Sequence, residues 1–392
     1  MVLIHICIVI DRTHPSDMLN LNVGGIANQV LLLLASYEKI NDIKISLITR
    51  FSKYKPNSDR IKIYQIHRFK NFYLDEIYFN LKSFNTIFKI HKNEPIDVLN
   101  IHHFTIFHIL PLIIRFLYKI PILVKMPTDF SNYIRNISMQ KTHRIFLELY
   151  SYSWLKFFKK FILKKIDYVR AINADVLDAL IKLNYPENRI LILPNGISLE
   201  RYKLIKKTER SHSNYGFVGR LTEIKNLGFI LKEFKKYFEL YPFDRFYIYG
   251  EGPELKSILN FINKYDLNKN IIYKGFQKEK SIIYSNIDVL INASFTEGIS
   301  NSILEAFSTK TFVIASNVSG NRDLIKSKIT GLLFNPYKSG SLLKQLVIYK
   351  DNKILIQTVL DNAQNEVLNN YDIDLITQKI YQFLKSEFIL QK

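Results

Sequence analysis

Residues 289–306 read VLINASFTEGISNSILEA. The apolar run Val289–Asn292 predicts a buried strand, Gly298 belongs to the turn that follows, and a helix is expected to begin near Ser300 to Ser302. The free backbone N–H groups of such a helix start favour an anion. A strand, a turn and a helix in this order are the repeating unit of a parallel α/β sheet, which is therefore the predicted fold class.

The same alternation of short apolar runs and helical segments continues on both sides of this stretch. In the first half, strands are expected at Leu3–Ile10, Lys44–Thr49, Ile61–Ile66, Val98–Ile101, Ile122–Met126, Tyr168–Ala171 and Ile190–Leu193, with helices such as Ile26–Ile40 and Leu74–His91. In the second half they are expected at Tyr215–Val218, Arg245–Tyr249, Ile271–Lys274, Val289–Asn292, Thr311–Ala315 and Gly331–Phe334, with helices such as Leu227–Tyr237 and Ser302–Ser308. Two such sets predict two Rossmann-like, doubly wound domains facing each other across a ligand-binding cleft.

The boundary between the two halves is expected in the polar segment KLIKKTERSHS, residues 203–213. We therefore expect an N-terminal domain over residues 1–205 and a C-terminal domain over residues 206–370. A final helix over residues 371–392 is expected to cross back to the N-terminal domain.

Composition excludes some classes of protein. The chain of 392 residues is 47% hydrophobic, and no stretch reaches the run of about 18 apolar residues that a membrane-spanning helix needs. Its start, MVLIHICIVIDRTHP, lacks a basic region and a small-residue cleavage site, so it predicts a buried strand rather than a signal peptide. The single cysteine, Cys7, excludes a disulfide framework. A cytoplasmic location is the simplest expectation.

The net charge of +20 favours an anionic partner: nucleic acid, an acidic membrane surface or a phosphorylated substrate. The alternative is compositional, because Lys, Ile and Asn are used heavily throughout the chain and many lysines then only face water.

Three glycine-containing turns follow predicted strands. Asn22–Ile26 has paired glycines that let the backbone approach a ligand, although a plain tight turn also fits. Phe217–Asn226 carries Arg220 and Lys225, and two cations above a strand end suit a diphosphate, although basic loops usually face solvent. Tyr249–Glu254 is a glycine-rich turn that needs no function.

Two glutamates flank the turn and helix of the opening stretch. Glu297 precedes the helix and Glu305 lies on its first turns, and carboxylates accept hydrogen bonds well from paired sugar hydroxyls. The alternative for Glu305 is an ordinary helical surface residue, because Glu is a strong helix former.

Taken together, these segments resemble the retaining glycosyltransferases of the GT-B class, specifically family 4 (glycosyl transferases group 1). The resemblance is carried, in the family's order, by Gly24-Gly25, LPNGI at 193–197, VGRLTEIKN at 218–226, YGEGPE at 249–254, YKGF at 273–276, EGISNSILEA at 297–306, SNVSGNRDLI at 316–325 and TGLLFNP at 330–336. It is specific over roughly residues 190–340 and looser in the N-terminal half.

The resemblance implies a nucleotide-sugar donor, expected to be a UDP-sugar, bound mainly by the C-terminal domain without a metal. It assigns catalytic roles to Glu297, which contacts the donor sugar, and to Arg220 and Lys225, which hold the diphosphate. Its implied donor-binding residues are Glu305 at the ribose, Gly298, the backbone amides of Ser302 and Ile303 at the phosphate, Gly25 from the opposite domain, and Gly275 beside the base.

The mechanism expected from these groups follows from charge. Breaking the sugar–phosphate bond builds negative charge on the leaving diphosphate, which preorganised cations and helix-end amides stabilise. Arg220 and Lys225 then take the place of a metal, and the sequence contains no His/Cys cluster with metal-ligand spacing. The pair Asp372 and Asp374 forms a DxD pattern, which we interpret as a cap of the final helix.

The N-terminal half departs from the family pattern. Where many relatives have a histidine after the fifth strand, this chain has Pro127 within Lys125–Asp129. His103 and Asp129 are the acceptor-side candidates, although His103 also fits a structural histidine at a strand end.

A basic, aromatic segment bears on partners. Residues 153–165, SWLKFFKKFILKK, interleave aromatic side chains with lysines, and the region Lys156–Lys165 can lie on an anionic membrane. The alternative is a helix packed on its own sheet with its lysines in water.

The leading prediction is therefore an enzyme that transfers a hexose or N-acetylhexosamine with retention to a glycan or lipid-linked acceptor, in bacterial capsule, lipopolysaccharide or glycolipid synthesis. One alternative is a sugar-nucleotide epimerase on the same fold. Another is a non-enzymatic nucleic-acid-binding or scaffold protein, although no nucleic-acid-binding motif is present and no nucleic acid is expected.

Overall fold

The computed structural model describes residues 3–10, 25–50, 54–67, 72–102, 109–126, 163–203, 205, 207 and 210–388. The chain forms two compact units, one comprising Met1–Gly196 with Ile373–Lys392 and the other Ile197–Asp372. The boundaries predicted from the sequence lie at residues 205/206 and 370/371.

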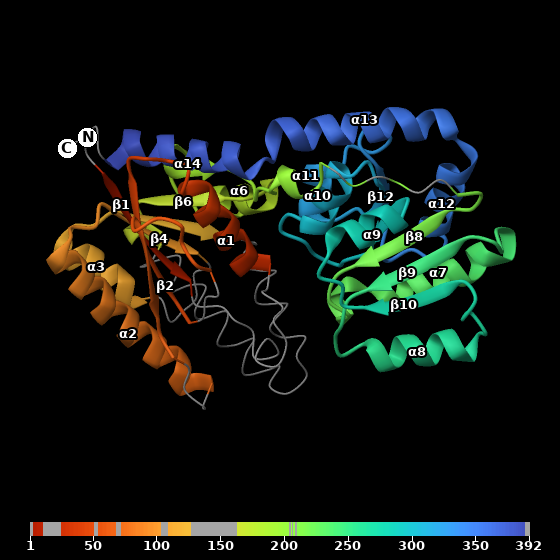
Figure 1. Cartoon of the computed structure of the whole chain (residues 1–392), viewed down its shortest axis with the longest axis horizontal. Coiled ribbons are helices and arrows are strands. Elements are labelled where there is room, and N and C mark those ends of the chain that lie inside the picture. The colour runs from red at the N-terminus through yellow and green to blue at the C-terminus, as the bar shows by residue number, and fades with distance from the viewer. Residues whose placement is uncertain are drawn as a thin grey trace. The chain divides into compact units, whose positions relative to one another are not determined.

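The first unit is built on a seven-stranded parallel sheet with the strand order β3-β2-β1-β4-β5-β6-β7 (Figure 1). Its strands are β1 (Ile4–Ile10), β2 (Ile43–Thr49), β3 (Ile61–Gln65), β4 (Val98–His102), β5 (Ile122–Met126), β6 (Tyr168–Ala171) and β7 (Ile190–Ile192). Every residue of β1, β4 and β5 is buried, as expected for central strands covered on both faces.

Two helical layers cover this sheet. On one face, helices α1 (Gly25–Tyr37) and α14 (Ile373–Phe388) contribute to one apolar core. On the other, α2 (Phe72–Asn93), α3 (Ile109–Tyr118) and α6 (Ala174–Lys182) contribute to a second. The last helix, α14, therefore belongs to the first unit although it follows the second in the chain. Its Asp374 accepts hydrogen bonds from Ser36 (2.6 Å) and Lys39 (2.5 Å).

The second unit is built on a six-stranded parallel sheet with the order β10-β9-β8-β11-β12-β13 (Figure 1). Its strands are β8 (Asn214–Val218), β9 (Arg245–Tyr249), β10 (Ile271–Gly275), β11 (Val289–Asn292), β12 (Phe312–Ser316) and β13 (Leu332–Phe334). Its helices are α7 (Leu227–Leu240), α8 (Leu255–Lys264), α9 (Lys280–Asn286), α10 (Asn301–Ser308), α11 (Ser319–Leu324), α12 (Ser341–Asp351) and α13 (Lys353–Asn370).

Short 3-10 turns complete the described elements, at Leu163–Lys165, Glu187–Arg189, Leu199–Arg201 and Glu223–Lys225. No helix in the described ranges has both the length and the apolar composition to span a bilayer.

Both sheets share one topology, in which the first strand is central, the next two lie on one side and the later ones on the other. The strands predicted from the apolar runs are present, each within one residue of its expected ends. The expected two-domain α/β fold is thereby confirmed. In such sheets the crevice between the first and fourth strands is where ligands bind, because the connections leave in opposite directions there. In the second unit this crevice lies between β8 and β11.

Candidate active site

Two loops meet above the carboxyl ends of β8 and β11. Because these strands are paired in parallel, the loop after β8 lies beside the loop after β11. A backbone hydrogen bond of 2.9 Å from Phe295 N to Ile224 O joins the loops directly. The 3-10 turn Glu223–Lys225 thus places its last residue, Lys225, against the turn that contains Glu297.

Lys225 and Glu297 form an ion pair, with Lys225 Nζ 2.6 Å from Glu297 Oε1. The same oxygen accepts hydrogen bonds from Ser294 (2.8 Å) and Asn292 (3.2 Å). The two side chains of the ion pair are 26% and 11% exposed, so the pair is partly shielded from water and still reachable by a ligand. Burial by itself raises the pKa of Glu297, but the Lys225 charge and the hydrogen bonds on the carboxylate hold it below its ordinary value. Glu297 is therefore an anion at neutral pH.

Close backbone packing supports the Glu297 turn from α11. Gly320 N donates to Glu297 O (3.2 Å), and a Cβ atom on Gly320 would lie 1.6 Å from the carbonyl oxygen of Gly298. Only glycine allows this approach. Asn321, next in α11, donates to Ser316 O (3.1 Å) and lies fully buried, which ties the helix to the end of β12.

The loop that carries Arg220 is supported in the same way by the turn after β9. Gly219 N donates to Tyr249 O (3.0 Å) and Leu221 N to Glu251 O (2.9 Å). Gly250 has a φ of +143°, and a Cβ atom there would lie 1.8 Å from Gly219 O. The YGEGPE segment therefore acts as a support for the Arg220 loop. The Arg220 side chain itself is exposed.

Glu305 lies on α10 and is 7% exposed. Its Oε2 accepts a hydrogen bond from the hydroxyl of Tyr284 (2.7 Å) and lies 3.0 Å from Lys280 Nζ. Both partners come from α9. The carboxylate is thus held from a neighbouring helix rather than pointing freely into water, which contradicts the alternative of an ordinary surface residue.

The start of α10 carries two more predicted residues. Ser302 lies in the first turn, where its hydroxyl is 3.1 Å from that of Ser300 and its carbonyl accepts from Tyr284 (3.2 Å). Ile303 is fully buried, so only its backbone is available to a ligand.

The remaining predicted residues lie on other elements or outside the described residues. Gly275 ends β10 with a φ of +68°, and its carbonyl accepts from Gly250 N (2.8 Å). Gly25 is the first residue of α1 in the first unit. His103 and Asp129 lie outside the described residues, as does most of the basic segment 153–165. His102 ends β4 fully buried, and neither of its ring nitrogens has a hydrogen-bond partner in the described structure.

Two family models match the chain. The model for glycosyltransferase family 4 matches residues 23–201, and that for glycosyl transferases group 1 matches residues 212–350. The chain is a family 4 (group 1) glycosyltransferase of the GT-B class. The matches support neither a sugar-nucleotide epimerase nor a nucleic-acid-binding or scaffold protein. An enzyme of this kind works on a nucleotide sugar and an acceptor.

Individual relatives agree with the family. The glycosyltransferase is 27% identical over 315 residues to the UDP-Gal:alpha-D-GlcNAc-diphosphoundecaprenol alpha-1,3-galactosyltransferase of Escherichia coli, covering 77% of this chain and 78% of the relative. It superimposes on a glycosyltransferase from Rickettsia africae with a TM-score of 0.77 and 17% identity, covering 98% of both chains. It superimposes on Anabaena HepE, solved with UDP and glucose, with a TM-score of 0.71 and 15% identity, covering 98% of this chain and 100% of that one. The two solved structures support the shared fold.

The polar side chains that hold the two glutamates of the glycosyltransferase are not among the residues predicted from its sequence. Asn292 and Ser294 close an apolar strand with polar residues at its carboxyl end, a signal that marks a ligand-binding edge. Tyr284 and Lys280 left no comparable signal, because their link to Glu305 depends on how α9 packs against α10. Among the residues the structure describes, no group of three or more His, Cys, Asp or Glu side chains is placed to hold a metal ion.

Proposed function

We propose that this glycosyltransferase moves a hexose or N-acetylhexosamine from a UDP-sugar, with retention, to a glycan or lipid-linked acceptor in bacterial surface polysaccharide or glycolipid synthesis. The names of the relatives support this choice. The Escherichia coli enzyme is named for a UDP-sugar donor and a diphosphate-linked lipid acceptor, and Anabaena HepE was solved with UDP and glucose.

The contact between Lys225 and Glu297 is the observation that carries the proposal. A nucleotide sugar has a doubly charged diphosphate joined directly to a sugar with many hydroxyls. A cation and a carboxylate 2.6 Å apart match those two neighbouring groups, with Lys225 for the phosphate and Glu297 for the sugar. The bond that breaks then lies next to both side chains.

In this mechanism the leaving diphosphate is stabilised by fixed charges. Lys225, the exposed guanidinium of Arg220 and the backbone N–H groups around Gly298, Ser302 and Ile303 supply positive charge where negative charge develops. The ionised Glu297 accepts hydrogen bonds from the sugar and favours the positive charge that grows on it as the bond breaks. These groups do the work of a divalent cation, so the proposed reaction requires no metal.

The rest of the donor is assigned to the second unit as well. Glu305 takes the ribose hydroxyls, and the turn at Gly275 borders the base. Gly25 of the first unit is proposed to contact the phosphates.

His103 and Asp129 are proposed to assist the acceptor, and the basic segment Lys156–Lys165 is proposed to contact an anionic membrane from the cytoplasmic side.

A thermal-shift titration with UDP, GDP and ADP tests the donor assignment. A ligand present at 100 times its Kd stabilises a protein by about 3 kcal/mol, which shifts Tm by several degrees. We expect UDP to give the largest shift. A larger shift with GDP or ADP would refute the choice of base, and no shift with any of the three would refute a nucleotide-sugar donor. Proton NMR of the product then reads the anomeric configuration and tests retention.

A further inference from the structure

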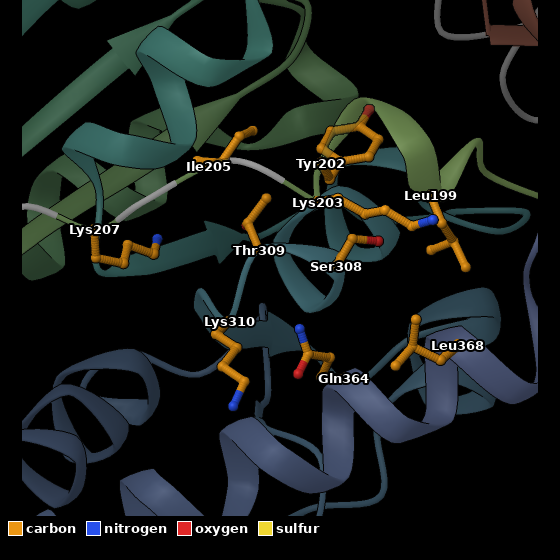
Figure 2. A pocket seen from close by; sticks show the side chains of 10 residues that line it. All are labelled: Leu199, Tyr202, Lys203, Ile205, Lys207, Ser308, Thr309, Lys310, Gln364 and Leu368. Carbon is orange, nitrogen blue, oxygen red and sulfur yellow. The ribbon is translucent and has the colours of Figure 1, made fainter.

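The second unit contains a pocket of about 290 Å³ whose walls come from the segment before β8, from the end of α10 with the residues that follow it, and from α13. Figure 2 shows Tyr202, Ile205 and Lys207 on the first wall and Ser308 and Thr309 on the second. The amine of Lys207 contacts Tyr284, Ile287 and Thr311, which are all buried.

The amine of Lys207 has three partners. Its Nζ donates to the carbonyl oxygens of Tyr284 (2.7 Å) and Ile287 (2.6 Å) and contacts Oγ1 of Thr311. Tyr284 lies in α9, Ile287 directly follows it, and Thr311 directly precedes β12. Lys207 therefore joins the segment before β8 to two elements that are distant in sequence.

Two routes lead from Lys207 to Glu305. Along the first, Lys207 holds the carbonyl of the fully buried Tyr284, whose hydroxyl donates to Glu305 Oε2 (2.7 Å). Along the second, Thr311 Oγ1 lies 2.9 Å from Thr309 Oγ1, which in turn donates to the carbonyl oxygen of Glu305 (3.0 Å). Both the side chain and the backbone of Glu305 are thus connected to one amine.

These partners suit the amine in either protonation state. An ammonium donates to the two carbonyls and to the Thr311 oxygen, which leaves the Thr311 hydroxyl free to donate to Thr309. A neutral amine keeps its two N–H groups on the carbonyls and accepts from the Thr311 hydroxyl, at the expense of the Thr311–Thr309 hydrogen bond. Burial lowers the pKa of Lys207 to about 7, with the Asp288 charge opposing and the Arg210 charge reinforcing that shift. The contacts with the Tyr284 and Ile287 carbonyls, which carry the first route, therefore persist through neutral pH.

We propose that Lys207 is a positioning residue for the donor: it fixes α9, and through Tyr284 it holds the Glu305 carboxylate in place to receive the ribose. The inference rests on the proposed function, in which Glu305 binds the nucleotide. Lys207 itself touches no substrate in this scheme. Its loss should weaken nucleotide binding and leave the chemical step unchanged.

The first experiment compares Lys207→Met with Lys203→Met. Lys203 is a pocket residue whose amine contacts only the exposed Glu200 among the described side chains, so it is a matched control. Wild-type protein is first titrated with UDP, GDP and ADP, and the tightest-binding nucleotide is used. For Lys207→Met we expect Kd for that nucleotide and KM for its sugar to rise about tenfold, the effect of losing one charged hydrogen bond, with kcat within about twofold. Lys203→Met should match the wild type.

The second experiment is a double-mutant cycle with Tyr284→Phe, which removes the hydroxyl on Glu305. If Lys207 acts through Tyr284, the double variant binds nucleotide only about as weakly as the worse single variant. Effects that multiply would overturn that route. Tyr284→Phe keeps the carbonyl that Lys207 holds, so it tests the link from Tyr284 to Glu305 by itself should Lys207→Met fail to fold. Nucleotide binding as tight as in the wild type by Tyr284→Phe would overturn the proposal.

The outcomes separate the two claims. If the wild type binds none of the three nucleotides, the proposed function fails and the inference fails with it. If the wild type binds one of them and folded Lys207→Met binds it equally well, the inference alone is wrong. A rise in the Kd of both lysine variants would show a general effect of the pocket and would also overturn it.

Discussion

At the scale of single residues, Glu297 and Lys225 determine one another's chemistry. The lysine keeps the carboxylate ionised in a site where burial alone would favour its protonated form. The carboxylate in turn balances a cation that is only 26% exposed. Removing either partner leaves a partly buried charge without its counter-ion, which costs stability as well as function.

Glu297→Gln and Lys225→Met should therefore each lower kcat of sugar transfer by about 10² or more, as observed when one preorganised group at a developing charge is lost. Initial rates with saturating donor measure the effect, and circular dichroism checks the fold. Lys256→Ala, an exposed lysine on α8, is the control and should retain wild-type rates. Near-normal turnover in a folded Glu297→Gln enzyme would remove Glu297 from the catalytic site.

At the scale of elements, the site depends on glycines that let neighbouring turns touch. Gly320 in α11 lies against the carbonyl of Gly298, and Gly250 after β9 lies against that of Gly219. In each case the segment that follows one strand supports the loop that follows the preceding strand in the chain. The SNVSGNRDLI and YGEGPE segments of the family pattern therefore support the loops of the candidate site through backbone contacts.

Gly320→Ala should destabilise the protein by about 2–4 kcal/mol, because the added methyl group cannot fit at 1.6 Å from a backbone oxygen. Donor KM should rise together with this loss, since the Glu297 turn must shift. Urea denaturation and steady-state kinetics provide the measurements. Gly228→Ala is the matched control, because the added carbon would meet nothing within 4 Å beyond its chain neighbours and the backbone of its own helix. In helix α7 this substitution should be neutral or stabilising by up to about 1 kcal/mol. Equal stability of the two variants would contradict the steric explanation.

At the scale of the whole molecule, two sheets of the same strand order carry different parts of the proposed reaction. The second unit holds most of the residues proposed for the donor, and Lys225 and Glu297 lie on the loops after β8 and β11. The first holds Gly25 and the proposed acceptor side. The charge of +20 belongs to this scale too, since a cationic protein attracts both a diphosphate donor and an anionic acceptor or membrane.

Because lysine, arginine and helix-end amides are proposed to replace a metal, transfer should persist when divalent cations are removed. We expect at least about half of the initial rate after dialysis against EDTA, in an assay with radiolabelled donor. Loss of activity on chelation with recovery on adding Mn²⁺ would contradict the proposed mechanism. A metal-dependent transferase assayed in parallel shows that the chelation was effective.

Local patterns in the sequence are enough to predict the strands and their order along the chain, and they single out the candidate site residues. Apolar runs such as Val289–Asn292 are long enough and well enough bounded to show a buried strand, and the turns that follow them contain Arg220, Lys225 and Glu297. These signals are local, because strand period, turn residues and helix starts involve neighbours in the chain.

Which of those residues meet depends on how the strands and helices pack. The pairing of β8 with β11 brings Lys225 to 2.6 Å from Glu297, and the packing of α9 on α10 places Tyr284 on Glu305. In the sequence Lys207 is one of several cations in a polar segment, and in the fold its amine donates to two carbonyls. Burial and contacts between distant segments result from packing, so a pattern of neighbouring residues does not predict them.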